Sequence, residues 1–282
     1  MNISNNVVKF PILNDPNVSL GIGDIQISKK TASIAIGYQA GLFTQSTYAI
    51  AIGYQAGQTN QRTASVAIGY QAAQNDDTSL VGFRAGKNVA IGYQAGLSYQ
   101  YQFGVAIGSE AGEQQGNASV AIGNRAGRVS QSFYSVAIGY QAGEYIQDSG
   151  SIAIGSESGQ DQMAACISIG YQAGQTNQRT NSIAIGYQAG QITQLQSSIA
   201  IGYQAGMISQ GTNSVAIGYQ AGMTGQSSNS IVINADPTTW VDTTYRSQPG
   251  LFVRPIRSGA GAVGVNVLYY DTTTFEIRYS TT

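Results

Sequence analysis

The sequence predicts an all-β protein, a parallel β-solenoid of about 15 rungs followed by a small C-terminal β module. Versions of one phrase, Ser-Ile-Ala-Ile-Gly-Tyr-Gln-Ala-Gly, recur between Ser33 and Asn234, most often every 16 residues. In each copy large apolar residues alternate with small ones at period two, which indicates a strand rather than a helix. Because so short a unit cannot bury a core alone, we expect consecutive copies to stack as rungs.

Three zones follow along the chain. Residues 1–30 are a polar lead-in that ends in a degenerate first rung, Val18-Ser19-Leu20-Gly21-Ile22-Gly23. Residues 31–234 are the repeat array, closed by a last copy in which Asn234 replaces the glycine. Residues 235–282 contain the only tryptophan and two β-prone runs around the polar stretch Asp271–Thr274, which predicts a hairpin.

The first glycine of each copy, called here the phrase glycine, marks the rungs. The phrase glycines are Gly37, Gly53, Gly69, Gly82, Gly92, Gly108, Gly123, Gly139, Gly155, Gly170, Gly186, Gly202 and Gly218. The copy at Gly82 lies 13 residues after one neighbour and 10 before the next, too few for a complete coil. We therefore expect a kink, a missing side or a groove there.

The alternation within one copy divides its side chains between two faces. In Ser182–Gly186, Ile183 and Ile185 share one face, and Ser182 and Ala184 share the other. We expect the large side chains to fill the interior of the solenoid. The small face would then look outward, either toward solvent or toward a closely packed second subunit.

Three columns of identical side chains follow from the register, and stacked amides and rings stabilise such columns. The tyrosine ladder consists of the residues directly after the phrase glycine: Tyr38, Tyr54, Tyr70, Tyr93, Tyr140, Tyr171, Tyr187, Tyr203 and Tyr219. A glutamine follows each of these tyrosines and forms a second column. A glutamine ladder lies eight residues after the phrase glycine: Gln45, Gln61, Gln100, Gln131, Gln147, Gln178, Gln194, Gln210 and Gln226. Glu110 and Arg125 occupy one column in neighbouring rungs and predict an ion pair, whereas Arg84 and Glu157 lack a partner of opposite charge.

The composition argues against several classes of function. A net charge of −1 gives no electrostatic reason to bind nucleic acid or an anionic membrane. No apolar run approaches the roughly 20 residues that span a bilayer. Without histidine, and with Cys166 as the only cysteine, the chain has no catalytic triad and no structural zinc site. We therefore expect no catalytic residue, no cofactor and no metal, and a protein that is not an enzyme.

Two stretches of the array, Asn181–Gly186 and Asn213–Gly218, resemble the head repeats of YadA-like trimeric autotransporter adhesins. The resemblance implies a left-handed parallel β-roll and a homotrimer, with three rolls packed about a threefold axis. The C-terminal segments Gly250–Arg257 and Leu268–Ile277 resemble instead parts of phage and giant-virus fibre proteins.

These observations predict a structural fibre or spike protein. The first interpretation is a trimeric viral fibre shaft, of a phage tail fibre or a giant virus, that lies on the virion surface or outside the cell and attaches to a host-surface receptor. The alternatives are a bacterial or environmental surface adhesin head, and an extracellular filament whose rods assemble end to end. An ice-binding solenoid is a further alternative, but threonine forms no fixed column in the array.

Overall fold

The computed structural model describes residues 25–28, 32–75, 86–239, 241, 249–255, 267–271 and 276–280. Within these ranges all secondary-structure elements are β-strands, as the sequence predicts. The strands of the main sheet, in their order across it, are β1 (Ile25–Ser28), β2 (Ser33–Ile36), β3 (Ile50–Ile52), β4 (Val66–Ile68), β5 (Val89–Ile91), β7 (Val105–Ile107), β9 (Val120–Ile122), β10 (Val136–Ile138), β12 (Ile152–Ile154), β14 (Ile167–Ile169), β16 (Ile183–Ile185), β18 (Ile199–Ile201), β20 (Val215–Gly218), β21 (Ile231–Asn234) and β22 (Leu251–Arg254).

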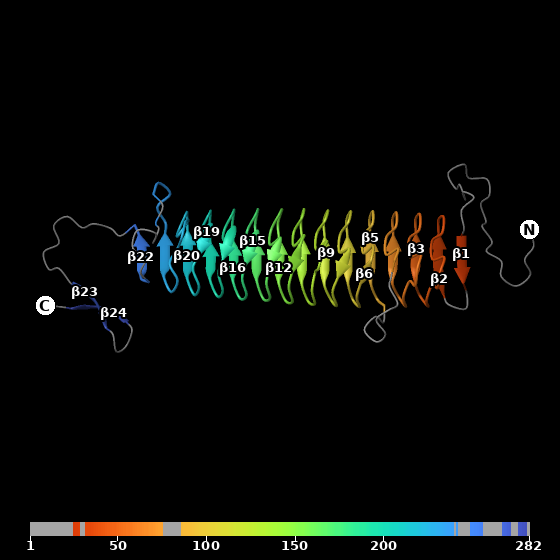
Figure 1. The fold of residues 1–282 in the computed structure, drawn as a ribbon, viewed down its shortest axis with the longest axis horizontal. Helices are drawn as coiled ribbons and strands as arrows, with labels where there is room; N and C mark the ends of the chain where they lie inside the picture. Colours follow the sequence, from red (N-terminus) through yellow and green to blue (C-terminus); the bar gives the residue numbers. More distant parts are fainter. Residues whose placement is uncertain are drawn as a thin grey trace, which may run out of the picture.

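The main sheet forms one wall of an elongated solenoid (Figure 1). From β2 to β21 its strands pair in parallel and in the register of the phrase, so that Ala184 lies opposite Ala200 and Ile185 opposite Ile201. Shorter strands form a second wall: β6 (Tyr99–Gln100) pairs with β8 (Gln114–Gln115), while β11 (Ile146–Gln147), β13 (Asp161–Gln162), β15 (Thr176–Gln178), β17 (Ile192–Gln194) and β19 (Ile208–Gln210) form a five-stranded sheet. The parallel β-solenoid predicted from the repeat is therefore confirmed.

The stack has about 13 turns, fewer than the sequence suggested. Strand β4 pairs directly with β5, Val66 opposite Val89, so no further strand lies between these two in the main sheet. Gly82 and Arg84 lie outside the described residues. At the other irregular position, β1 runs antiparallel to β2 and occupies the edge where a degenerate first rung was expected. The residues of that expected rung, 18–23, also lie outside the described part of the chain.

The C-terminal part contributes to two sheets. Strand β22 pairs in parallel with β21, Leu251 opposite Ile231, so the main sheet continues beyond residue 234. Strands β23 (Val267–Asp271) and β24 (Glu276–Ser280) pair antiparallel and form the predicted hairpin.

The interior of the solenoid is lined by small residues, which reverses the expected orientation of the strands. Ala184 and Ser182 are fully buried, whereas Ile183 and Ile185 are only half-buried and face outward. Close packing at the corner explains this: a Cβ added to Gly190 would lie 3.2 Å from the Cβ of Ala184 and 2.6 Å from Oε1 of Gln194, which fills the rest of the interior. So narrow a space accepts alanine or serine but no isoleucine, because extra methylenes in a close-packed interior force neighbouring atoms apart.

Corners with positive φ bring the walls this close. The phrase glycine Gly186 has φ +129°, and a Cβ there would meet the carbonyl oxygen of Gly202 in the next rung. Gln188, two residues later, also adopts a positive φ, of 53°. Glycine is required at the first of these positions by the contact with the neighbouring backbone, not by φ alone.

Candidate functional site

The predicted glutamine ladder lies inside the solenoid. Gln178 is fully buried, and its Nε2 donates to the backbone oxygen of Ile167 at 3.1 Å and to Oε1 of Gln194 at 3.1 Å. Each such amide therefore crosses the interior from the second wall to the main sheet and also joins two rungs. An unbroken run of these hydrogen bonds connects Gln131, Gln147, Gln162, Gln178, Gln194, Gln210 and Gln226.

Two members of this ladder were not predicted from the sequence. Gln115 and Gln162 lie seven rather than eight residues after their phrase glycines, in the rungs of 15 residues. Gln162 is fully buried and accepts from Gln147 and donates to Gln178. The signal that could have found them is the shortened spacing itself, since a deletion between the glycine and the glutamine shifts the amide by one position.

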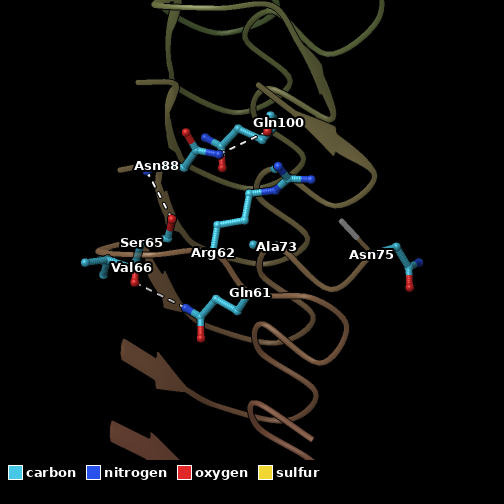
Figure 2. Close-up of a pocket in the computed structure, with 9 residues that line it drawn as sticks. Gln61, Arg62, Ser65, Val66, Ala73, Asn75, Asn88 and Gln100 are labelled. Carbon is cyan, nitrogen blue, oxygen red and sulfur yellow. Dashed lines mark hydrogen bonds between the residues drawn. The ribbon is translucent and has the colours of Figure 1, made fainter. Parts of the chain in front are cut away.

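The ladder is interrupted between the rungs of β4 and β5. Gln61 and Gln100 lie on either side of a small cavity with room for about one water molecule (Figure 2). Asn88 lies beside this cavity, where its side-chain amide donates to the backbone oxygen of Gln100 at 3.0 Å. Gln45 donates to Gln61 at 3.1 Å, so this amide pair forms a separate segment of the ladder.

The tyrosine ladder lies on the outside and consists of two stacks. Rings of neighbouring rungs are nearly parallel, with centroids 5.1–5.3 Å apart. The N-terminal stack contains Tyr38, Tyr54, Tyr70 and Tyr93, and the C-terminal stack contains Tyr171, Tyr187, Tyr203 and Tyr219. Tyr140 belongs to neither, because Asn124 and Ser156 occupy its position in the adjacent rungs. The stacked tyrosines stay exposed even in the interior of a stack, for example 44% of the residue surface at Tyr187.

A second amide network runs beside the tyrosines on the surface. Gln55 and Gln58 each donate to Oε1 of Gln39 at 2.8 Å, and the same pattern recurs further along, where Gln188 and Gln191 donate to Gln172. Here each amide donates toward the preceding rung, whereas the inner ladder donates toward the following one. Water competes for the hydrogen bonds of half-exposed amides, so these bonds contribute less to the stability of the fold than those of the inner ladder.

Charged residues replace the outer amides in the middle of the rod. Arg125 Nε donates to Glu110 Oε2 at 3.0 Å, and this hydrogen bond raises the pKa of Arg125 above its ordinary value. Arg128 lies 3.4 Å from the same carboxylate and 3.6 Å from Oε1 of the buried Glu144. The sequence anticipated neither Arg128 nor Glu144. Glu157 has no arginine beside it but accepts from the amides of Gln172 and Gln175.

The outward isoleucine and valine side chains form a continuous apolar feature of the described surface. Within the main sheet they occupy the third and first residues before each phrase glycine, and we call these two columns the outer apolar face. The members that expose more than a third of their surface include Ile34, Ile36, Ile169, Ile201, Ile217, Ile231 and Ile233. The face follows the main sheet along the whole stack.

The described residues contain one cysteine and no cluster of metal ligands. Cys166 is fully buried in the inner column that serine occupies in other rungs, and burial raises the pKa of its thiol. A thiol that is neutral and buried is a poor nucleophile. Within the described ranges no group of three or more Cys, Asp or Glu side chains could hold a metal ion. None of the described segments is a helix long and apolar enough to cross a membrane.

Comparison with known proteins agrees with this geometry. Residues 209–222 match the family described as the YadA head domain repeat, in two copies. Searches of curated proteins and of solved structures found no match. This stretch of the chain is thus similar to YadA head repeats, and it lies within a parallel β-solenoid.

Proposed function

We propose that the chain is a non-catalytic structural rod, outside the cell or on a particle surface, that self-associates side by side through its outer apolar face into a homotrimer. The outward isoleucines and valines are the observation that carries this proposal. A soluble monomer rarely exposes a large contiguous apolar patch, and such patches mark interaction sites. A column of identical residues on a straight rod suits a second copy, because both partners then repeat at the same spacing.

The match to the YadA head domain repeat supports the trimeric form and an adhesin-like role. An adhesin-like fibre holds its binding surface away from the body that carries it, and a rigid stack of rungs is suited to that task. The end-to-end filament receives less support, because the antiparallel strand β1 covers one edge of the main sheet.

This role has two versions, a surface adhesin head of a cell and a fibre shaft of a virus. The match to the YadA head domain repeat supports the adhesin head. A viral fibre shaft that attaches to a host receptor is favoured only by the antiparallel hairpin β23–β24, in the segment that resembles fibre proteins. The surrounding genes discriminate the two: capsid genes beside this one would favour the virion fibre, and a secretion signal on the full reading frame would favour the adhesin.

The native mass tests self-association. We expect a particle of about three times the 29.5 kDa chain mass by light scattering, with the pair Ile201→Gln and Ile217→Gln shifting it toward the monomer. The matched control is Ile146→Gln with Ile192→Gln, two residues of the second wall that are 49% and 42% exposed, against 37% and 39% for the first pair. A wild-type monomer, or equal dissociation of both double variants, would contradict the proposal.

A further inference from the structure

The two tyrosine stacks place phenol rings in contact at a fixed spacing along the rod. Within the N-terminal stack the centroids of Tyr54 and Tyr70 lie 5.1 Å apart with an angle of 6° between the ring planes. The backbone holds both residues at the same position of successive rungs, since the backbone N–H of Gln71 donates to the carbonyl oxygen of Tyr54 at 2.8 Å. The rings are also accessible, with 42% of Tyr54 and 44% of Tyr70 exposed.

We propose that consecutive tyrosines of each stack are sites of oxidative cross-linking, in which a one-electron oxidant joins neighbouring rungs through dityrosine. The oxidant takes one electron from each of two adjacent tyrosines, and each phenol loses its hydroxyl proton to water. The two phenoxyl radicals form one carbon–carbon bond between ring positions ortho to the hydroxyls, and the hydrogens at these positions move to the phenol oxygens. The net change is the transfer of two electrons to the oxidant and the release of two protons.

Proximity selects the stacks over the other tyrosines. Coupling requires two radicals to meet, and groups held in contact react as if at a very high local concentration. Tyr134 and Tyr48 are the most exposed tyrosines of the described residues, at 67% and 64%, but the equivalent positions beside them in the stack hold Ala118, Gly150 and Ala64. Exposure alone would favour these two residues, whereas contact favours the stacks.

The reaction has a structural consequence for the rod. A carbon–carbon bond between rungs 16 residues apart would hold them together after the amide ladders and the backbone pairing have opened. In each stack the cross-links lie outside the interior, so their formation requires no opening of the solenoid. A haem peroxidase acting with hydrogen peroxide is one class of oxidant that would supply the electron acceptor.

The test uses the intact protein, a small photogenerated oxidant and peptide mapping. Ruthenium(III) tris-bipyridyl, produced by light and persulfate, oxidises exposed phenols, and trypsin is applied after denaturation. Cleavage after Arg62, Lys87 and Arg179 separates three of the stacked pairs onto different peptides. We expect linked pairs that join residues 31–62 to 63–84, residues 63–84 to 88–125, and residues 129–179 to 180–246, each at the mass of the two peptides less two hydrogens.

Two variants on one peptide give the matched comparison, since phenylalanine keeps the ring and its packing but forms no phenoxyl radical. Tyr54→Phe should abolish the link between residues 31–62 and 63–84 and leave the other two links. Oxidation should also raise the midpoint of unfolding less in this variant than in the wild-type protein. Tyr48→Phe, which removes a more exposed phenol from the same peptide, should leave all three links. Persistence of the first link in Tyr54→Phe, links that centre on Tyr134 or Tyr140, or dityrosine found only between chains would each overturn the proposal.

Discussion

Substitution of one inner glutamine tests whether the buried amide ladder stabilises the solenoid. Gln194 is fully buried, accepts from Gln178, and donates to Gln210 Oε1 at 3.0 Å and to the backbone oxygen of Ile183 at 2.8 Å. Gln194→Met keeps the length and shape of the side chain but leaves Gln210 Oε1 without this donor. A buried group that loses its partner costs about 1–3 kcal/mol, and the more apolar side chain returns part of this. We expect a net loss of about 2 kcal/mol.

The same change on the surface supplies the control. Gln204 makes two hydrogen bonds of 2.9 Å to amides of neighbouring rungs but is only half-buried, so water can replace both. Gln204→Met should therefore change the free energy of unfolding by less than about 0.5 kcal/mol. Urea unfolding followed by circular dichroism, with hydrogen exchange to locate the loss near β17, measures the difference. Equal effects of the two substitutions would refute the assignment of separate inner and outer ladders.

Three further predictions concern single positions. Gly186→Ala should cost more than about 3 kcal/mol, because its Cβ would overlap the carbonyl of the next rung at a φ of +129°, and thermal unfolding checks this. Ala184→Ile should destabilise the solenoid by about 3 kcal/mol through overpacking, whereas Ile185→Ala should destabilise each protomer by only about 1 kcal/mol. Chemical unfolding measures both changes, and a larger effect of Ile185→Ala would show that the isoleucines face the interior. Hydrogen bonds from Thr238 lower the pKa of Asp236 from 3.8 in the unfolded chain to about 2 in the folded protein. The carboxylate therefore stabilises the fold fully at pH values above 3.8, and this stabilisation is lost as the pH falls through about 2. Asp236→Asn should flatten this part of the profile of unfolding against pH, and an unchanged profile would show that another carboxylate causes it.

The repeated phrase was sufficient to predict the parallel stack, because identical rungs at constant spacing have one register in which every copy meets its equivalent. The orientation of the strands could not be predicted in the same way. Alternation at period two shows that Ile183 and Ala184 face opposite sides, but it does not show which side is the interior. That choice depends on the space inside the stack, which Gln194 and the corner at Gly190 leave only wide enough for a side chain the size of Ala184.

The candidate site was partly predictable for a related reason. Columns at a fixed offset from the phrase glycine were visible in the sequence, whereas Gln115 and Gln162 were hidden by one-residue deletions. The division of the two glutamine columns into a buried ladder and a surface ladder depends on the same interior space. The copy at Gly82 has the sequence of a rung, and only the direct pairing of β4 with β5 shows that no strand of the main sheet lies between them.

The reversed orientation also changes how stability and association are related in this protein. The interior contains mainly alanine, serine and glutamine, so its stability rests on backbone pairing and on buried amides that hydrogen-bond to one another and to the backbone. The isoleucines and valines, which would form the core of most proteins, lie outward in columns that the protomer itself cannot cover. A rung added to such a rod therefore extends the solenoid and the outer apolar face by the same step. Under the proposed side-by-side self-association, a longer array would therefore gain rungs and contact area together.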